Sequence, residues 1–175
     1  INTVVQREVN DHTILDLLAY FRGTGHIVRL IEFMDVGNQN NWSYDAVITA
    51  KEVLEKIEEK WSVTPLHQTH KGEVAKRYAY DDGEGEIGFI TSVSRPFCGD
   101  CSRARISADG KLYTCLFASE GTDLRMLLRG GASDEEIHNV FSRLWLARTD
   151  RYSELRNTKK SIQTVKKVEM YRMGG

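Results

Sequence analysis

The sequence predicts an α/β fold, in which a parallel βαβ unit precedes an antiparallel region. Residues 1–5 and 27–34 are apolar runs rich in β-branched side chains, and the second is nearly continuous, as in a strand covered on both faces. Between these runs, four apolar residues recur at helical spacing: Ile14, Leu17, Leu18 and Phe21. After Pro65, two alternating runs flank a turn rich in Asp and Gly, which indicates an antiparallel hairpin.

The first predicted helix follows Asn10 or Asp11, either of which can cap it, and ends at the Gly-Thr-Gly of residues 23–25. Strand, helix and strand at this spacing should lay two parallel strands side by side. Met34 and the polar loop of residues 35–42 would then lie at a carboxyl end of the sheet, where functional groups gather in such folds. A methionine at such a place is more often core filler than a ligand contact, so both readings stay open.

Two further helices are predicted from capping boxes. Thr49 and Glu52 open the first, and Ser133 and Glu136 open the second. The second helix carries an apolar stripe that we expect to be core packing: Ile137, Val140, Phe141, Leu144 and Trp145. The remaining expected elements are strands at residues 74–80 and 86–90 and a short helix at residues 123–129.

Composition narrows the classes of function. The 175 residues make one ordinary domain by length, and 24 basic against 25 acidic residues give no overall charge that would favour nucleic acid. An odd number of cysteines, with neither a signal peptide nor a membrane-spanning apolar run, argues against a secreted disulfide scaffold. A cytoplasmic protein with a metal site fits better. Because the chain begins at Ile1 without an initiator Met, we expect a fragment of a longer protein.

All three cysteines lie within one short segment, with the spacing C-x2-C-x13-C: Cys98, Cys101 and Cys115. Three thiolates in this pattern can occupy three corners of an iron–sulfur cluster and leave one iron open to a substrate. A structural zinc site formed by His67, His70, Cys98 and Cys101 is the alternative, although it leaves Cys115 unexplained. Three unligated cysteines gathered by chance are the least favoured interpretation.

The hairpin between the second and third cysteines can form in two registers. A two-residue Asp-Gly loop would pair Ala104 with Cys115 and put both neighbouring arginines on the other face. A three-residue loop with Gly110 left-handed would pair Arg103 with Cys115, so that Arg103, Arg105 and Cys115 share a face. We predict the second register, because it joins a metal site to two guanidiniums suited to phosphate.

Residues 96–117 resemble the C-terminal cluster motif of the GTP 3′,8-cyclase family, the radical S-adenosylmethionine enzymes of molybdenum cofactor biosynthesis. Residues 1–5, 29–37 and 174–175 resemble further stretches of that family in the same order, so the resemblance covers the whole chain. The resemblance implies that Cys98, Cys101 and Cys115 hold the second [4Fe–4S] cluster of the family. The open iron of that cluster would bind the guanine part of GTP.

The resemblance also implies roles for individual residues. The segment Arg103-Ala104-Arg105 would contact GTP, with Arg103 and Arg105 as catalytic partners of its phosphates or of the transition state. Met34 would lie at the S-adenosylmethionine site, and Arg29 would face the same cavity. The tail at residues 174–175 would reach into the active site. The reaction would cyclise GTP to a pyranopterin precursor, after a deoxyadenosyl radical abstracts hydrogen from the ribose.

The sequence departs from the family in one respect. The first [4Fe–4S] cluster of the family is held by a C-x3-C-x2-C motif that this chain does not contain, so we do not expect the fragment alone to be active. The family fold is an incomplete (β/α) barrel. Residues 1–64 would supply its last strands and helices, and residues 65–175 would form the cluster-binding region that caps it. A homodimer is expected, without membrane or nucleic-acid partners.

Overall fold

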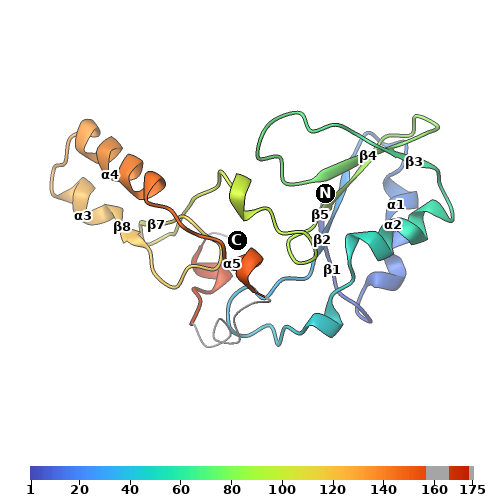
Figure 1. Ribbon diagram of the computed structural model, residues 1–175, viewed down its shortest axis with the longest axis horizontal. Helices are drawn as coiled ribbons and strands as arrows, with labels where there is room; N and C mark the ends of the chain where they lie inside the picture. Colours follow the sequence, from blue (N-terminus) through green and yellow to red (C-terminus); the bar gives the residue numbers. More distant parts are fainter. Residues whose placement is uncertain (157–165, 174–175) are drawn as a thin grey trace. The chain divides into compact units, whose positions relative to one another are not determined.

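In the computed structural model, residues 1–156 and 166–173 are described. They form two compact units (Figure 1). The first unit contains residues 1–34 and 42–100, and the second contains residues 35–41 and the described residues from 101 onward. The boundary predicted between residues 64 and 65 falls inside strand β3 (Val63–Pro65), because later strands complete the sheet of the first unit. The assignment of residues 1–64 to a barrel stays a prediction.

The first unit is built on a mixed five-stranded sheet. Its strands in spatial order are β1 (Asn2–Val5), β2 (Val28–Glu32), β5 (Glu86–Ile90), β4 (Lys76–Tyr80) and β3 (Val63–Pro65). The pairs β1–β2 and β2–β5 are parallel, whereas β3–β4 and β4–β5 are antiparallel. The predicted change from parallel to antiparallel pairing is confirmed, and it occurs within one sheet.

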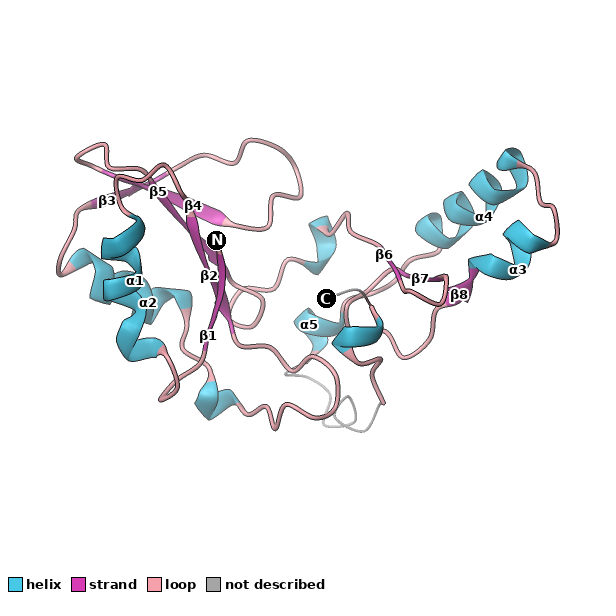
Figure 2. Cartoon of the chain, turned by 180° about the vertical axis from the view of Figure 1, so that it is seen from behind, coloured by secondary structure: helices cyan, strands magenta, loops and turns pink. Residues whose placement is uncertain are grey.

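Helices α1 (Ile14–Phe21) and α2 (Ala50–Glu58) lie on the same side of this sheet (Figures 1 and 2). The capping box of α2 is confirmed, because the Thr49 side chain accepts from the N–H of Glu52 and the Glu52 carboxylate accepts from the N–H of Thr49. The predicted cap of α1 is wrong. A 3-10 turn, η1 (Asp11–Thr13), precedes that helix, and the N-cap residue Thr13 makes no side-chain cap hydrogen bond.

Between the helices and the sheet lies an apolar core. It includes three side chains that are almost completely buried: Leu18 of α1, Ile57 of α2 and Ile87 of β5. The β2 strand contributes alternate residues, with Val28, Leu30 and Glu32 buried and Arg29 exposed. The expectation that this strand is covered on both faces was therefore wrong within the first unit, since its apolar run is interrupted by outward-facing Arg29. A second 3-10 turn, η2 (Tyr44–Ala46), leads into α2.

The second unit is built on a small antiparallel sheet, with three strands of two or three residues: β6 (Arg105–Ile106), β7 (Lys111–Tyr113) and β8 (Thr122–Asp123). Its helices are α3 (Leu124–Arg129), α4 (Asp134–Leu146), α5 (Tyr152–Leu155) and the 3-10 turn η5 (Met170–Arg172). The Ser133–Glu136 capping box of α4 is confirmed. None of the helices that the structure describes is long and apolar enough to cross a membrane.

The apolar stripe of α4 is not the core element that its pattern predicts. No residue of α4 is buried, Trp145 is 40% exposed, and Leu146 is 86% exposed. The α4 helix lies beside α3 (Figure 2), which itself buries only Leu124. The stripe is partly covered because the short strands and α3 offer little apolar surface to pack against.

Candidate functional site

The loop of the β6–β7 hairpin decides which predicted site residues share a face. Gly110 has a φ of 75°, a left-handed conformation that glycine adopts without strain. Its N–H donates to the carbonyl oxygen of Ser107 at 2.9 Å, and the N–H of Ser107 donates to the carbonyl oxygen of Lys111 at 2.9 Å. The loop therefore consists of residues 108–110, with Gly110 at the bulge, as predicted.

The strand pairing confirms the predicted register. Arg105 pairs with Tyr113, and the same register continued by two residues would set Arg103 opposite Cys115. Arg103 precedes β6, and Cys115 follows β7 in a bend, so a face shared by Arg103, Arg105 and Cys115 stays a prediction. Ala104, between the two arginines, is exposed.

Cys101 is held by two arginines of the second unit. The Nη2 of Arg103 donates to the Cys101 Sγ at 3.2 Å, and the Nη1 of Arg148 donates to the Cys101 carbonyl oxygen at 2.5 Å. Burial by itself raises the pKa of the Cys101 thiol, but hydrogen bonds from Arg148 and Arg103 outweigh burial and hold that pKa below its ordinary value. The thiolate form, which is the metal ligand, is thereby favoured.

Cys115 and Arg105 lie in the same electrostatic environment. The Sγ of Cys115 accepts a hydrogen bond from the N–H of Phe117 at 3.5 Å. Burial and the like charge of Arg103 lower the pKa of Arg105, and the sulfurs of Cys101 and Cys115 oppose that shift. The sulfurs of Cys101 and Cys115 and the guanidiniums of Arg103 and Arg105 therefore interact electrostatically. Such an arrangement is expected where a thiolate site lies beside an anion-binding site.

Cys98 begins the 3-10 turn η3 (Cys98–Asp100), at the end of the first unit. The convergence of its sulfur with those of Cys101 and Cys115 stays a prediction. His67 and His70, the other ligands of the zinc alternative, are exposed in the loop after β3, and the His70 Nδ1 lies 2.9 Å from the Thr69 Oγ1. In the described ranges, no three His, Cys, Asp or Glu side chains are grouped so as to hold a metal ion.

The donor chemistry nevertheless fits a thiolate-bound cluster. No disulfide joins Cys98, Cys101 or Cys115, and each of them is partly buried. The sulfurs of Cys101 and Cys115 already accept N–H hydrogen bonds, which are the contacts that tune iron–sulfur clusters in proteins. The assignment of Cys98, Cys101 and Cys115 together as the residues that would hold such a group stays a prediction.

The remaining predicted residues lie at the end of the first unit or outside the described ranges. Met34 is half-buried just beyond β2, at the carboxyl end of that strand. Arg29 projects from β2 across Gly88 of β5, where an added Cβ would come within 3.1 Å of the Arg29 Cγ. A side chain at position 88 would thus displace Arg29. The tail at residues 174–175 lies outside the described residues.

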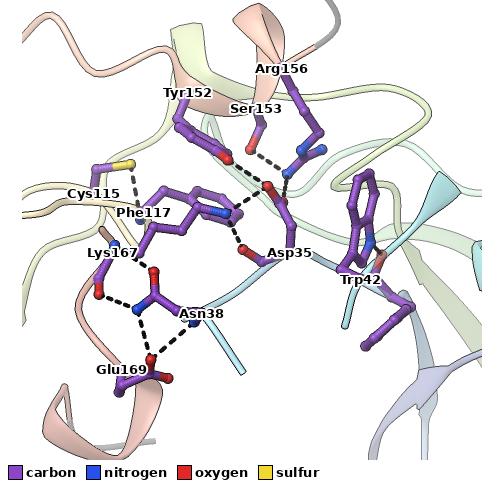
Figure 3. Close-up of polar contacts among 11 residues, drawn as sticks. Asp35, Asn38, Trp42, Cys115, Phe117, Tyr152, Ser153, Arg156, Lys167 and Glu169 are labelled. Atoms are coloured by element: carbon purple, nitrogen blue, oxygen red, sulfur yellow. Dashed lines mark hydrogen bonds and ion pairs between the residues drawn. The ribbon is translucent and has the colours of Figure 1, made fainter. Parts of the chain in front are cut away.

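A buried charge cluster around Asp35 in the second unit was not predicted (Figure 3). The Asp35 Oδ2 accepts from the Tyr152 hydroxyl at 2.5 Å and from the Lys167 Nζ at 2.9 Å. The Arg156 Nη2 lies 2.8 Å from the Asp35 Oδ1, and the Asp35, Arg156 and Lys167 side chains are only 11%, 4% and 9% exposed. Burial raises the pKa of Asp35, but the hydrogen bonds from Lys167 and Tyr152 and the charge of Arg156 bring it below its ordinary value.

Asn38 extends this cluster to the backbone of residues 167–169 (Figure 3). Its side-chain amide donates to the Lys167 carbonyl oxygen at 2.7 Å and accepts from the Lys167 N–H at 3.0 Å. The same amide donates to the Glu169 carboxylate at 2.7 Å. Asp35 and Asn38 together hold the last described segment of the chain. An acidic residue directly after the apolar run of residues 27–34 was the only sequence signal for this arrangement.

Glu32 of β2 is a second buried carboxylate that the sequence analysis did not single out. It is 3% exposed, and its oxygens accept from the N–H groups of Ala50 at 3.0 Å, Val93 at 2.9 Å and Ser94 at 2.8 Å. A buried carboxylate needs hydrogen-bond donors, and here the backbone supplies them. These bonds tie Glu32 both to the first residue of α2 and to the turn that follows β5. That turn leads along the chain to Cys98.

A polar pocket of about 800 Å³ also lies in the second unit. Basic residues (Lys111, Lys166, Arg172), acidic residues (Asp109, Glu120) and the buried ring of Tyr113 are among those that line it. The mixed charge of these walls favours no single class of ligand.

Comparison with known proteins identifies the family. The family described as Molybdenum Cofactor Synthesis C matches residues 26–154. A curated relative named GTP 3′,8-cyclase from Xanthomonas campestris pv. campestris is 51% identical over 175 residues, which are 100% of this chain and 50% of the relative. Relatives of the same name from Staphylococcus epidermidis and Synechococcus sp. are 44% and 46% identical, and the matches cover 100% of this chain and 52% and 49% of those proteins.

The chain spans about half the length of these curated relatives. The match extends through the whole C-x2-C-x13-C segment and both arginines that follow its second cysteine. The resemblance found in the sequence is thus confirmed, and the chain belongs to the Molybdenum Cofactor Synthesis C family.

Proposed function

We propose that this chain is the C-terminal half of a GTP 3′,8-cyclase that acts in molybdenum cofactor biosynthesis. In this proposal Cys98, Cys101 and Cys115 hold a second [4Fe–4S] cluster, and residues 103–105 bind GTP. The observation that supports it is the β6–β7 register, which pairs Arg105 with Tyr113 and, continued by two residues, would bring Arg103 and Arg105 to the face of Cys115. A one-residue change of register would separate the thiolate from both guanidiniums.

The arginines are suited to an anionic substrate. Arg103 and Arg105 repel each other in a partly buried place, and this repulsion contributes to the lowered pKa of Arg105. A bound phosphate would relieve that repulsion, and both guanidiniums can donate paired hydrogen bonds to its oxygens. When bound, the cluster supplies an iron without a protein ligand, at which a substrate atom can coordinate. The chain itself contributes the sulfur ligands, the positive charge and their common orientation.

In the complete protein, the first unit and the N-terminal half would together form the S-adenosylmethionine site. Its parallel strands β1, β2 and β5 would be among the last strands of an incomplete (β/α) barrel, and β1 stands at one edge of the described sheet. Met34, at the carboxyl end of β2, would contact S-adenosylmethionine. The first [4Fe–4S] cluster would come from the N-terminal half, so this chain alone should not cyclise GTP. The complete enzyme would act as a homodimer.

Metal analysis tests the cysteine assignment. The chain purified without oxygen, or reconstituted with iron and sulfide, should contain about four iron atoms, and replacement of any one cysteine by serine should lower that content. Zinc that is retained by the wild type and lost on His67→Ala would instead support the Cys2His2 alternative.

GTP binding tests the arginine assignment. The Arg105→Ala variant of the iron-loaded chain should bind GTP about 10- to 100-fold more weakly, because one charge-assisted contact is worth about 1.5–3 kcal/mol. Its iron content should be unchanged. Arg143→Ala, which removes an exposed arginine of α4, is the matched control and should leave GTP affinity unaltered. Normal GTP binding by both Arg103→Ala and Arg105→Ala would show that the substrate assignment is wrong.

A further inference from the structure

Arg148 contacts the candidate cluster site from a distant part of the sequence. It follows the C-terminal end of α4, and its Nη1 donates to the carbonyl oxygen of Cys101, 47 residues away, at 2.5 Å. The Arg148 side chain is only 10% exposed. The free-energy cost of removing a guanidinium from water must be offset by hydrogen bonds and by an opposite charge. The contacts of Arg148 are therefore part of the folded structure and not chance contacts of a mobile surface side chain.

A second set of contacts leads from Arg148 to the segment that directly follows β7. The Arg148 Nε donates to the Asp150 Oδ2 at 3.0 Å, and the Thr114 hydroxyl donates to the same oxygen at 2.6 Å. Thr114 is the residue directly before Cys115. One continuous chain of hydrogen bonds therefore runs from Cys101 through Arg148 and Asp150 to the neighbour of Cys115.

The shape of the arginine side chain is needed for this connection. Its planar guanidinium donates in two directions at fixed angles, which the single ammonium of lysine cannot reproduce. The guanidinium carbon also lies 4.8 Å from the centre of the Trp145 ring, so the ring limits the orientations that the fork can adopt. Trp145 belongs to the last turn of α4, and Arg148 follows the end of that helix. This helix buries no residue of its own, and it nevertheless delivers Arg148 to the cysteine segment.

We propose that Arg148 is a positioning residue, which fixes the segment of Cys101 relative to the segment of Cys115 so that both sulfurs are preset for one cluster. The inference rests on the proposed function, in which these cysteines are ligands. Groups that orient metal ligands through hydrogen bonds change metal affinity by about 10- to 100-fold when they are removed. Thr114 and Asp150 act with Arg148 as parts of the same chain of contacts.

Cluster retention in the iron-loaded 175-residue chain tests the proposal. Under anaerobic conditions, Arg148→Gln and Thr114→Val should each lose iron to a chelator about 10- to 100-fold faster than the wild type. Thr114→Ser keeps the hydroxyl group and should behave as the wild type, whereas Arg148→Lys, with its charge but not its fork, should lie between. Arg151→Gln removes a neighbouring arginine that is 64% exposed and should have no effect.

A spectroscopic readout separates positioning from general destabilisation. The electron paramagnetic resonance signal of the reduced cluster should differ between the Arg148 or Thr114→Val variants and the wild type, while Thr114→Ser restores the wild-type signal. If Arg148→Gln does not fold, the Thr114 pair still decides the question. Wild-type iron retention and an unchanged signal in both Arg148→Gln and Thr114→Val would overturn the role of Arg148 alone. A wild-type chain that binds no iron would overturn the proposed cluster and this inference together.

Discussion

The two units of this chain are stabilised in different ways. The first unit has an apolar core between two helices and a five-stranded sheet, and its largest fully buried side chains are aliphatic. The second unit has three very short strands, and its buried residues include Asp35, Ser107 and Arg156. Ion pairs and hydrogen bonds therefore accompany a smaller set of buried apolar residues in this unit: Leu112, Tyr113, Phe117, Leu124 and Met173. The candidate cluster residues Cys101 and Cys115 both belong to the second unit.

This difference has an energetic meaning. Apolar burial contributes about 1.5–3 kcal/mol for each fully buried aliphatic side chain and depends little on direction. A buried ion pair is favourable only if every charge keeps its partners, because the cost of removing the charges from water is large. The second unit is thus organised for a defined geometry, which a thiolate site requires, while the first supplies a stable scaffold.

The largest effect is expected at the centre of the charge cluster. Asp35→Ala removes the carboxylate from beside Arg156 and Lys167, which leaves two cationic groups in a buried place and should destabilise the second unit by about 3–5 kcal/mol. Hydrogen exchange measured by mass spectrometry should accelerate in peptides from residues 101–156 and 166–173, and not in peptides from the sheet of the first unit. Tyr152→Phe, which removes one hydrogen bond to Asp35, is the milder control. Equal acceleration in both units would contradict the distinction.

A somewhat smaller effect is expected from a cavity in the apolar core. Leu18 is 1% exposed, and Leu18→Ala should lower the free energy of unfolding of the first unit by about 3 kcal/mol. Hydrogen exchange should now accelerate in β2, β5 and α1, with the second unit unaffected. Tyr20→Ala, on the same helix and 76% exposed in the wild type, is the matched control and should change little. Acceleration confined to the second unit would show that the core assignment is wrong.

The sequence predicted local features well in both units. The helix of Leu18, the capping boxes at Thr49 and Ser133, and the left-handed Gly110 all follow from residues close together in the chain. The hairpin register followed as well, because the conformation of its loop determines which strand residues face each other. These features depend on short-range geometry, for which the side-chain pattern is sufficient.

The features that were missed depend on long-range partners. Asp35 meets Lys167 across 132 positions, and Arg148 meets Cys101 across 47, so no local pattern links them. The stripe of α4 showed that one face is apolar but not how much surface would cover it. Similarly, the apolar run of β2 did not reveal that Arg29 faces outward. The contribution of Cys98 to the site stays a prediction for the same reason.

The smallest effect compares one motif in both units. Thr49→Ala and Ser133→Ala each remove a capping box, a loss of about 1 kcal/mol for a helix N-terminus. The α2 helix is also anchored by buried Val53 and Ile57, whereas α4 has no buried residue. Loss of the cap should therefore fray only the first turn of α2. In α4, amide hydrogen exchange should accelerate along the whole helix, up to its last turns before Arg148. Ser133→Asp, which retains a capping oxygen, is the control and should keep exchange near the wild-type rate. Fraying limited to the first turn in both helices would contradict this prediction. It would mean that contacts of the half-buried apolar stripe hold α4 as firmly as the buried residues hold α2.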